Sequence, residues 1–513
     1  MLNQSQACNS LPSTEQLLIM GGDARLALDP VSGLNKYGCR PLPDPQLLAF
    51  GSSTASVIST EGFTVANRLR QTLLEAIVTE PHTAVYALEM QRIRSEWLQL
   101  CELSDVTGLE LVFSPSGTDI HAIAARYTGS GAPALVIMVE ANETGSGVFS
   151  ALAGYSGIDS STGEVAQVAI RLDDGTPRPA AAIDAEVEIL VSKAVASHRR
   201  VLLILVDQSK TGLIAPSPGC VIALHRRFPN NVEVLVDACQ FRIAIPTLRA
   251  YLEQGFMVAL TGSKFLSAPS FSAALLLPSI VAKRLQKRAF PRSLLSCSSR
   301  ANWPPYWTGA EHADHGANFG LLLRCEAALE ELRRFRAVPL TAAIEFLAAF
   351  AKAIRQRLLS DPHFEPLPVP QLDRRPLIEA SSWDHQQTIF PFLLYAPQPA
   401  GRMPLTREQT LRVYQQLPTK LDQANNKIAP VITPPPELIS IDGARQPLSI
   451  RCQLGQPVVC GTRNGIAVSA LRLCASSRLI VEAATHEAKG NAIIKNALAA
   501  LDKTVLLIQQ SGQ

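Results

Sequence analysis

The chain has 513 residues, of which 47% are apolar and 18% are charged, and its formal net charge at pH 7 is +3. This length predicts more than one domain, and the apolar share is ordinary for a well-buried globular protein. The small net charge comes with no long basic run, which argues against a nucleic acid or an anionic membrane as a partner.

The first twenty residues contain no basic start followed by an apolar core, so they do not resemble a secretory signal. No apolar run approaches the roughly 18 residues that a membrane helix needs. Ten cysteines are scattered along the chain without a Cys-x-x-Cys pair, which favours reduced, buried thiols. We therefore expect a cytoplasmic protein that does not span a membrane.

Residues 1–60 contain Gly, Pro, Asn and Ser with little periodicity, which predicts an N-terminal arm that contributes to a smaller domain. The pattern becomes helical over 62–102. From residue 109 onward, short apolar runs alternate with helical stretches, which is typical of βαβ units and a mostly parallel sheet. The expected strands are 109–113, 134–139, 201–206, 232–236, 257–260 and 273–277.

After residue 278 two helix patterns follow, over 318–338 and 340–359, and strands are expected near 448–454 and 471–474. Such helices often lead from a large domain into a small one. We expect an α/β fold with an arm at residues 1–60, a large domain at 61–325 and a smaller C-terminal α+β domain at 326–513.

Two of the expected strands end in polar residues that suit one cofactor. Asp237 closes the run Val-Leu-Val, and Lys264 follows the next run in Thr-Gly-Ser-Lys. In a parallel sheet both would lie at the carboxyl edge, where α/β proteins bind ligands. Pyridoxal phosphate needs a lysine for its aldehyde and a carboxylate for its ring nitrogen. The pair therefore indicates a pyridoxal-phosphate enzyme.

Each residue of the pair also has a simpler interpretation. A lysine attacks an aldehyde only when it is neutral, and apolar neighbours such as Phe265 favour the neutral amine, but a lysine after a strand is usually a solvated loop end. Asp237 has no nearby basic residue in the sequence, so a protonated ring nitrogen would supply the cation that a buried carboxylate needs. The alternative for Asp237 is a helix N-cap.

The phosphate of the cofactor needs backbone N–H groups at the start of a helix. Ser116, Gly117 and Thr118 precede a helix expected over 120–127, and glycine allows the backbone to approach closely. Plain helix caps look identical. Thr261 and Ser263, on either side of a glycine, are expected to add hydroxyl groups.

The ordered motifs Ser-Gly-Thr, Val-Asp-Ala-Cys-Gln and Thr-Gly-Ser-Lys, within about residues 110–280, resemble the fold type I pyridoxal-phosphate enzymes. The resemblance is closest to the class V aminotransferase and cysteine desulfurase branch. It implies a mostly parallel seven-stranded sheet, a smaller domain and a homodimer with active sites at the interface. It assigns Asp237 to the pyridine nitrogen, Gln240 to the ring oxygen and Lys264 to the aldehyde.

The resemblance implies further contacts. Gly117, Thr118, Thr261 and Ser263 are assigned to the phosphate. Gln208 or Ser209 takes the place of a strand-end polar residue that contacts cofactor or substrate. The segment Tyr-Trp-Thr-Gly-Ala resembles a loop that reaches the phosphate in the partner subunit, and Thr308 is its candidate residue.

The chain departs from the family's pattern in two places. The family usually stacks a histidine or an aromatic residue on the cofactor ring after the second strand, whereas residues 139–147 contain neither and offer only Asn142, Glu143 or Thr144. Desulfurases also carry a mobile catalytic cysteine downstream of the lysine. The candidates here lie in apolar, strand-like contexts that are typical of core thiols, and they are Cys452, Cys460 and Cys474.

Most enzymes of this fold bind a substrate carboxylate through an arginine of the small domain, because guanidinium and carboxylate form a bidentate pair. Arg472 fits best and Arg451 competes, although each is also typical of a surface strand. Asn35 lies in the arm segment 33–38, which, like 51–56, either closes over the substrate or forms simple loops.

The predicted function is a pyridoxal-phosphate enzyme that acts on an amino acid or amine by aminotransferase or lyase chemistry. Within the same fold, the alternatives are a decarboxylase, a desulfurase-like enzyme and a non-catalytic cofactor-binding protein. A different class, a metal-dependent hydrolase, would rest on His312 and His315, a weak pattern without a third distant ligand. We therefore expect no metal site.

Overall fold

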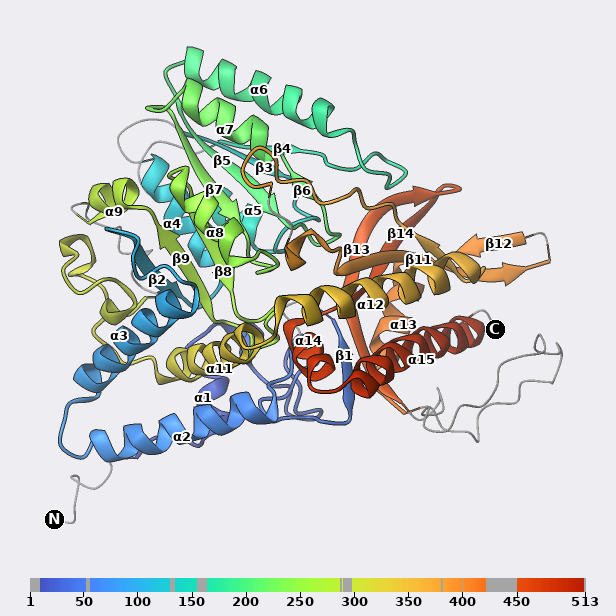
Figure 1. Ribbon diagram of the computed structural model, residues 1–513, viewed down its shortest axis with the longest axis horizontal. Helices are drawn as coiled ribbons and strands as arrows, with labels where there is room; N and C mark the ends of the chain where they lie inside the picture. Colours follow the sequence, from blue (N-terminus) through green and yellow to red (C-terminus); the bar gives the residue numbers. More distant parts are fainter. Residues whose placement is uncertain are drawn as a thin grey trace.

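The longest apolar runs of the chain form one large sheet in the computed structural model, which describes residues 10–51, 56–129, 134–154, 164–286, 288, 298–379, 382–399, 401–420 and 450–511. Its strands, in spatial order, are β2 (Glu110–Ser114), β9 (Ala273–Leu277), β8 (Met257–Thr261), β7 (Val232–Asp237), β5 (Arg200–Asp207), β3 (Ala134–Val139) and β4 (Glu164–Val168) (Figure 1). Only β9 runs antiparallel to its neighbours, and the short β6 (Ile214–Ala215) pairs antiparallel with β5. The predicted mostly parallel seven-stranded sheet is confirmed.

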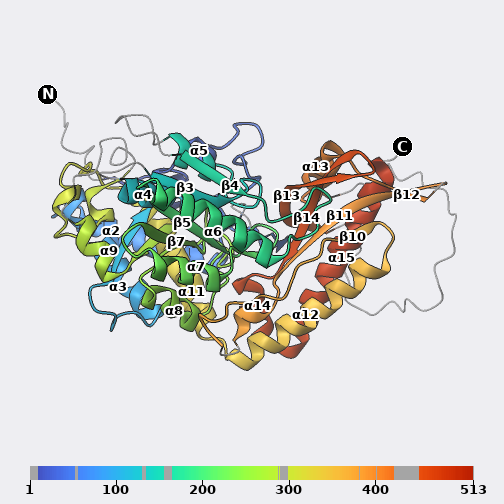
Figure 2. The same cartoon turned by 90° about the horizontal axis from the view of Figure 1, so that it is seen from above.

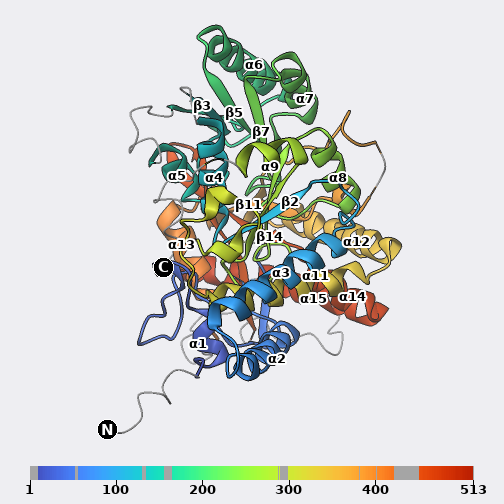
Figure 3. The same ribbon diagram turned by 90° about the vertical axis from the view of Figure 1, so that its left-hand side faces the viewer.

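Helices cover both faces of this sheet. Figure 3 shows α4 (Gly117–Gly129) and α5 (Val148–Gly154) on one face, and α7 (Pro218–Arg227) and α8 (Ile245–Glu253) on the other. The helix α6 (Ala180–Ala196) packs against β5 and lies next to α7. Every residue of β3 and β7 is buried, which explains why these strands read as continuous apolar runs. The strand β4 was not predicted because its residues are mostly exposed or half-buried at the edge of the sheet.

A second sheet lies beside the first (Figure 2). Its order is β1 (Leu47–Phe50), β13 (Arg451–Arg463), β14 (Ile466–Cys474), β11 (Ile389–Gln398) and β10 (Phe364–Pro366), and β12 (Gly401–Pro404) pairs with β11. The N-terminal strand β1 runs parallel to β13. Four helices accompany this sheet: α12 (Leu340–Ser360), α13 (Arg407–Gln416), α14 (Ser477–Ala484) and α15 (Glu487–Ser511). The predicted smaller C-terminal α+β domain is confirmed, and its sheet is mixed.

The helical stretch expected over 62–102 is two helices, α2 (Thr60–Ala76) and α3 (His82–Leu100). Pro81 precedes α3 in an extended conformation and so separates it from α2, because a proline is tolerated at the start of a helix but not in its interior. The helix α11 (Phe319–Arg336) packs against both of them. The remaining short helices are α1 (Thr14–Leu18) and α9 (Ser279–Leu285).

Taken singly, no described helix is long and apolar enough to cross a membrane. Only α11 and α12 taken together, with a 95° bend between them, meet the criteria of length and composition.

A fully buried arginine ties the segment between β10 and β11 to the large sheet. Arg374 donates from Nε and Nη2 to the two carboxylate oxygens of Asp207, at 2.7 and 2.8 Å. Its Nη1 donates to the backbone carbonyl of Asp384 at 2.9 Å. The hydroxyl of Tyr251 donates to the same Asp207 at 2.8 Å. The guanidinium of Arg374 therefore fixes the carboxyl end of β5 to the segment between β10 and β11.

Replacing this arginine tests how much the contact stabilises the fold. Arg374→Leu leaves the buried Asp207 carboxylate with Tyr251 as its remaining side-chain donor, so we expect the free energy of unfolding in urea to fall by about 3–5 kcal/mol. The matched control is Arg375→Leu, since the neighbouring arginine side chain is 73% exposed and Asp373 is its one ion-pair partner among the described residues. Equal losses in the two variants would contradict the expectation.

Candidate active site

One cavity lies where the carboxyl ends of the central strands meet the start of α4. Asp237 ends β7 and is in register with Ala259 of β8, so the strand before Lys264 lies directly beside the one that ends in Asp237. Nine of the predicted site residues line the cavity: Ser116, Gly117, Thr118, Asp237, Gln240, Thr261, Ser263, Lys264 and Arg472. The sheet therefore brings most of the predicted site together.

A buried histidine contacts the Asp237 carboxylate. His121 is 1% exposed, and its Nε2 lies 3.2 Å from Oδ2 of Asp237. The other carboxylate oxygen, Oδ1, accepts a hydrogen bond from the backbone N–H of Cys239 at 3.1 Å. The basic partner that the local sequence around Asp237 lacks is therefore supplied by α4.

The surroundings of the imidazole set its charge. Nδ1 of His121 lies 2.6 Å from the carbonyl oxygen of Gly117, and Nε2 faces a carboxylate. Both neighbours are acceptors, so each ring nitrogen is best satisfied as a donor, which is the imidazolium form. Burial lowers the pKa of His121, but Asp237 outweighs it and the pKa is raised. Burial raises the pKa of Asp237, yet His121 and then Lys264 hold it well below its usual value.

The start of α4 forms a cradle of backbone and hydroxyl groups. Ser116 and Asp119 cap each other, because the Ser116 hydroxyl and N–H both donate to the Asp119 carboxylate, at 2.8 and 3.0 Å. A Cβ added to Gly117 would lie 2.9 Å from Sγ of Cys239, so only glycine fits here without a shift. The hydroxyl of Thr261 donates to the Cys239 carbonyl at 2.6 Å, which holds the two strand ends together.

Lys264 follows β8 after a tight turn. A Cβ on Gly262 would come within 2.6 Å of Ala328 Cβ, so this turn also requires glycine. The Lys264 side chain is half-buried and lines the cavity, and its amine makes no hydrogen bond or ion pair with any described residue. The amine is therefore available to a bound molecule.

Arg472 reaches the cavity from β14 of the smaller sheet. Its guanidinium donates from Nε and Nη2 to the carbonyl of Gln456, at 3.2 and 2.9 Å, and from Nη1 to the carbonyl of Lys210 at 3.2 Å. The residue is 2% exposed, and within the described ranges no carboxylate pairs with it. Neutral carbonyls orient this charge without neutralising it.

Five predicted site residues lie outside the cavity. Ser209 donates to Glu143 at 2.8 Å, and Gln208 is buried beside it with both amide atoms lacking a partner in the described part of the chain. Arg451 pairs with Asp44 at 2.8 Å, so its charge is already compensated away from the cavity. The remaining two are Asn35, whose Oδ1 accepts backbone N–H groups within its own turn, and Thr308, which is exposed and bonded to the Gln286 carbonyl.

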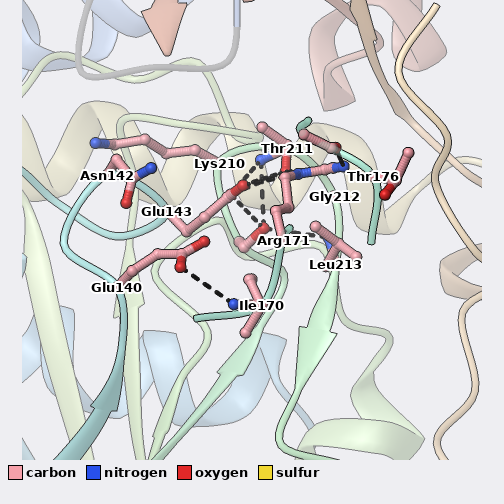
Figure 4. Close-up of polar contacts among 12 residues, drawn as sticks. Glu140, Asn142, Glu143, Ile170, Arg171, Thr176, Lys210, Thr211, Gly212 and Leu213 are labelled. Carbon is pink, nitrogen blue, oxygen red and sulfur yellow. Dashed lines mark hydrogen bonds and ion pairs between the residues drawn. The ribbon is translucent and has the colours of Figure 1, made fainter. Parts of the chain in front are cut away.

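The loop after β3 does not place a side chain from Asn142 or Glu143 in the cavity. The Glu143 carboxylate is buried and contacts Arg171, Ser209 and Thr211 instead (Figure 4). Asn142 donates to the Val459 carbonyl at 3.2 Å. The cavity wall here is made by Gly145, Ser146 and Val148, which follow in the same loop and in α5.

The cysteines that a desulfurase role would need are buried. Cys452 and Cys460 lie in β13 and Cys474 ends β14. Burial raises the pKa of Cys452 to about 12 and that of Cys460 to about 11, so these thiols stay protonated near neutral pH. His312 and His315 are exposed, and among the described residues no group of three or more His, Cys, Asp or Glu side chains is arranged to hold a metal ion.

Several cavity residues were given no role from the sequence, among them His121, Lys210, Arg25 and Tyr37. For His121 a signal existed, because a residue four positions after Gly117 lies on the same face of a helix. Lys210 stands next to the predicted Gln208 and Ser209, so only its side-chain direction was missing. Arg25 and Tyr37 belong to the N-terminal segment, whose loops carry no periodic pattern that would predict their positions.

A double-mutant cycle tests the ion pair between His121 and Asp237. We expect His121→Leu to lower the free energy of unfolding by about 3 kcal/mol, because Asp237 stays buried without its cation. Combining it with Asp237→Asn should cost at least about 1 kcal/mol less than the sum of the two single losses. Independent losses would contradict the pairing.

The pH dependence of that coupling follows from the two pKa shifts. Because the pKa of His121 is raised on folding, its contribution is complete below the ordinary histidine pKa of about 6.5 and disappears as the pH rises through the raised value. Because the pKa of Asp237 is lowered, its contribution disappears only as the pH falls through that lowered value. Urea unfolding of the four proteins of the cycle at several pH values measures both limits.

No protein-family model matches the sequence, and no curated protein matches it. Solved structures do match over most of their length. The cysteine desulfurase CsdA from Escherichia coli is 13% identical with a TM-score of 0.53, and the match covers 90% of this chain and 95% of that one. The tryptophan decarboxylase of Catharanthus roseus is 14% identical with a TM-score of 0.53, over 92% and 86% of the two chains.

A third match is the phosphoserine aminotransferase SerC from Cytophaga hutchinsonii, at 11% identity and a TM-score of 0.50, over 89% of this chain and 99% of that one. The three matches come from three kinds of enzyme, so they do not single out the class V branch that the sequence motifs resemble. Together with the two sheets and their strand order, they show that this chain has the type I fold of the pyridoxal-phosphate-dependent enzymes.

Proposed function

We propose that this protein is a pyridoxal-phosphate-dependent enzyme that acts on an amino acid or amine by aminotransferase or lyase chemistry. One observation carries the proposal: the Lys264 amine, the Asp237 carboxylate and the glycine-containing start of α4 line the same cavity. An amine for an aldehyde, an anion for a ring cation and a helix start for a phosphate are the three contacts that this cofactor needs.

The residues present fit the cofactor. The charge of Asp237 is maintained by His121, so it suits a protonated ring nitrogen at the cavity wall. Gly117 lines the cavity in close contact with Cys239, and Ser116 and Thr118 flank it with hydroxyl groups. We assign Gln240 to the ring oxygen, and Thr261 and Ser263 to the phosphate side. When bound, the cofactor supplies an electron sink for the charge that develops at the substrate's α-carbon.

The protein's own groups then have separate tasks. The Lys264 amine serves as the base that moves the proton of the α-carbon, since it is the half-buried amine that follows β8 at the cavity. Arg472 binds the substrate carboxylate, because its guanidinium is oriented by carbonyls and lacks an anionic partner among described side chains. His121 keeps Asp237 ionised through this cycle.

The proposal has two further parts. We propose a homodimer, in which Thr308, exposed outside its own cavity, contributes to the partner subunit's site. Desulfurase chemistry is the weaker alternative, because Cys452, Cys460 and Cys474 are buried.

The absorption spectrum of protein mixed with pyridoxal phosphate tests the cofactor. After unbound cofactor is removed, we expect a visible band from the lysine-bound form that is absent in Lys264→Ala, because Lys264 is the amine proposed to hold the aldehyde. Borohydride reduction followed by peptide mapping should label position 264.

Lys210 is the matched control, since it is the second lysine that lines the cavity. Lys210→Ala should keep the band. A label on position 210, or a band that survives in Lys264→Ala, would overturn the assignment. A bound cofactor whose band never responds to any amino acid would instead favour a non-catalytic cofactor-binding protein.

A further inference from the structure

Four lysine and arginine side chains line the cavity, and they are Arg25, Lys210, Lys264 and Arg472. Arg25 pairs with the carboxylate of Asp23 at 2.6 Å, so its charge is already compensated. The Lys210 carbonyl accepts a hydrogen bond from Arg472 at 3.2 Å, and the two positive charges are close enough to disfavour each other. Lys210 and Arg472 therefore form one basic pair at the cavity.

The loop that carries Lys210 is held by a buried network. The Lys210 N–H donates to the Glu143 carbonyl at 2.8 Å, while the next residue, Thr211, donates from its hydroxyl to the Glu143 carboxylate at 2.7 Å. Arg171 contacts the same carboxylate at 3.0 Å and Thr211 at 2.8 Å. Figure 4 shows the Lys210 side chain extending away from these contacts, so the backbone is fixed while the amine is left for the cavity.

This network does not neutralise Lys210. The charge of Glu143 is already matched by Arg171, and in the described residues neither Lys210 nor Arg472 forms an ion pair. Burial, and then the charges of Arg472 and Lys264, lower the pKa of Lys210 to about 8, and only Glu143 acts in the opposite direction. Two neighbouring cations without an anionic partner in a cavity favour a ligand that brings two negative charges.

We propose that the substrate is an amino acid with an acidic side chain, whose second anionic group, a carboxylate or a sulfonate, binds the Lys210 ammonium while Arg472 binds the α-carboxylate. This inference rests on the proposed function and specifies its substrate class. The cofactor phosphate is assigned to the start of α4, where Ser116, Gly117 and Thr118 line the cavity, which leaves Lys210 for the substrate.

Calorimetric titration of the protein loaded with pyridoxal phosphate tests the inference. The probes are L-aspartate and L-cysteate against their neutral counterparts L-asparagine and L-serine. We expect the acidic probes to bind about tenfold to a hundredfold more tightly, as one added charge-assisted hydrogen bond allows. Lys210→Met should abolish this preference and leave the affinity for pyridoxal phosphate unchanged, whereas Lys210→Arg should retain the preference.

Lys193→Met is the matched control, because it removes an exposed lysine from α6, a helix that contributes no residue to the cavity lining. This variant should behave as the unchanged protein. Equal binding of acidic and neutral probes, or a preference that persists in Lys210→Met, overturns the inference. So does a Lys210→Met variant that loses affinity for the cofactor instead. The failure of the proposed function is recognised separately, because it shows as a missing cofactor band. The binding heats of the acidic and neutral probes test the substrate class in either case.

The preference should also depend on pH. The charged groups that face Lys210 are Arg472 from β14, Lys264 from the turn after β8 and Glu143 from the loop after β3. Since the pKa of Lys210 is lowered to about 8, its ammonium is present below that pH, and the preference for acidic probes should fall as the pH rises through it. A preference unchanged by pH across this range contradicts the role of Lys210.

Discussion

The architecture of the cavity depends on keeping one carboxylate charged inside the protein. Asp237 ends β7 at 6% exposure, where an isolated charge is costly. His121 supplies the opposite charge, and the carbonyl of Gly117 orients its imidazole from the beginning of the same helix. One turn of α4 thus links the anion-binding helix start to the charge at the strand end, so a shift in either one disturbs the other.

Strand periodicity was enough to place Asp237 and Lys264, because parallel strands of known length bring their carboxyl ends to one edge. The bounds of β3 and β9 match the expected runs, those of β7 and β8 differ by one residue at one end, and those of β2 and β5 differ by one residue at each end. The partners of charged side chains were not predictable in this way. Arg451 pairs with Asp44, and His121 with Asp237, across long stretches of sequence, so no local pattern separates the compensated arginine from the free one.

The smaller sheet matters to the cavity because it delivers a charge and is itself held by one. Arg472 enters the site from β14, in the strand pair where its own neighbour Gly455 leaves room for the guanidinium. Arg374 fixes the segment between β10 and β11 to the end of β5. Buried ion pairs of this kind favour one arrangement of two sheets over others, since any other arrangement leaves Asp207 without its cation.

The parallel pairing of β1 with β13 has a consequence for biosynthesis. Leu47 meets Arg451, a residue made some 400 positions later, so this edge of the smaller sheet has no partner during most of translation. The nascent N-terminal segment must wait, unpaired, until β13 has left the ribosome. Because β1 and β13 are so far apart in the sequence, we expect their pairing to complete the second domain late and slowly during folding.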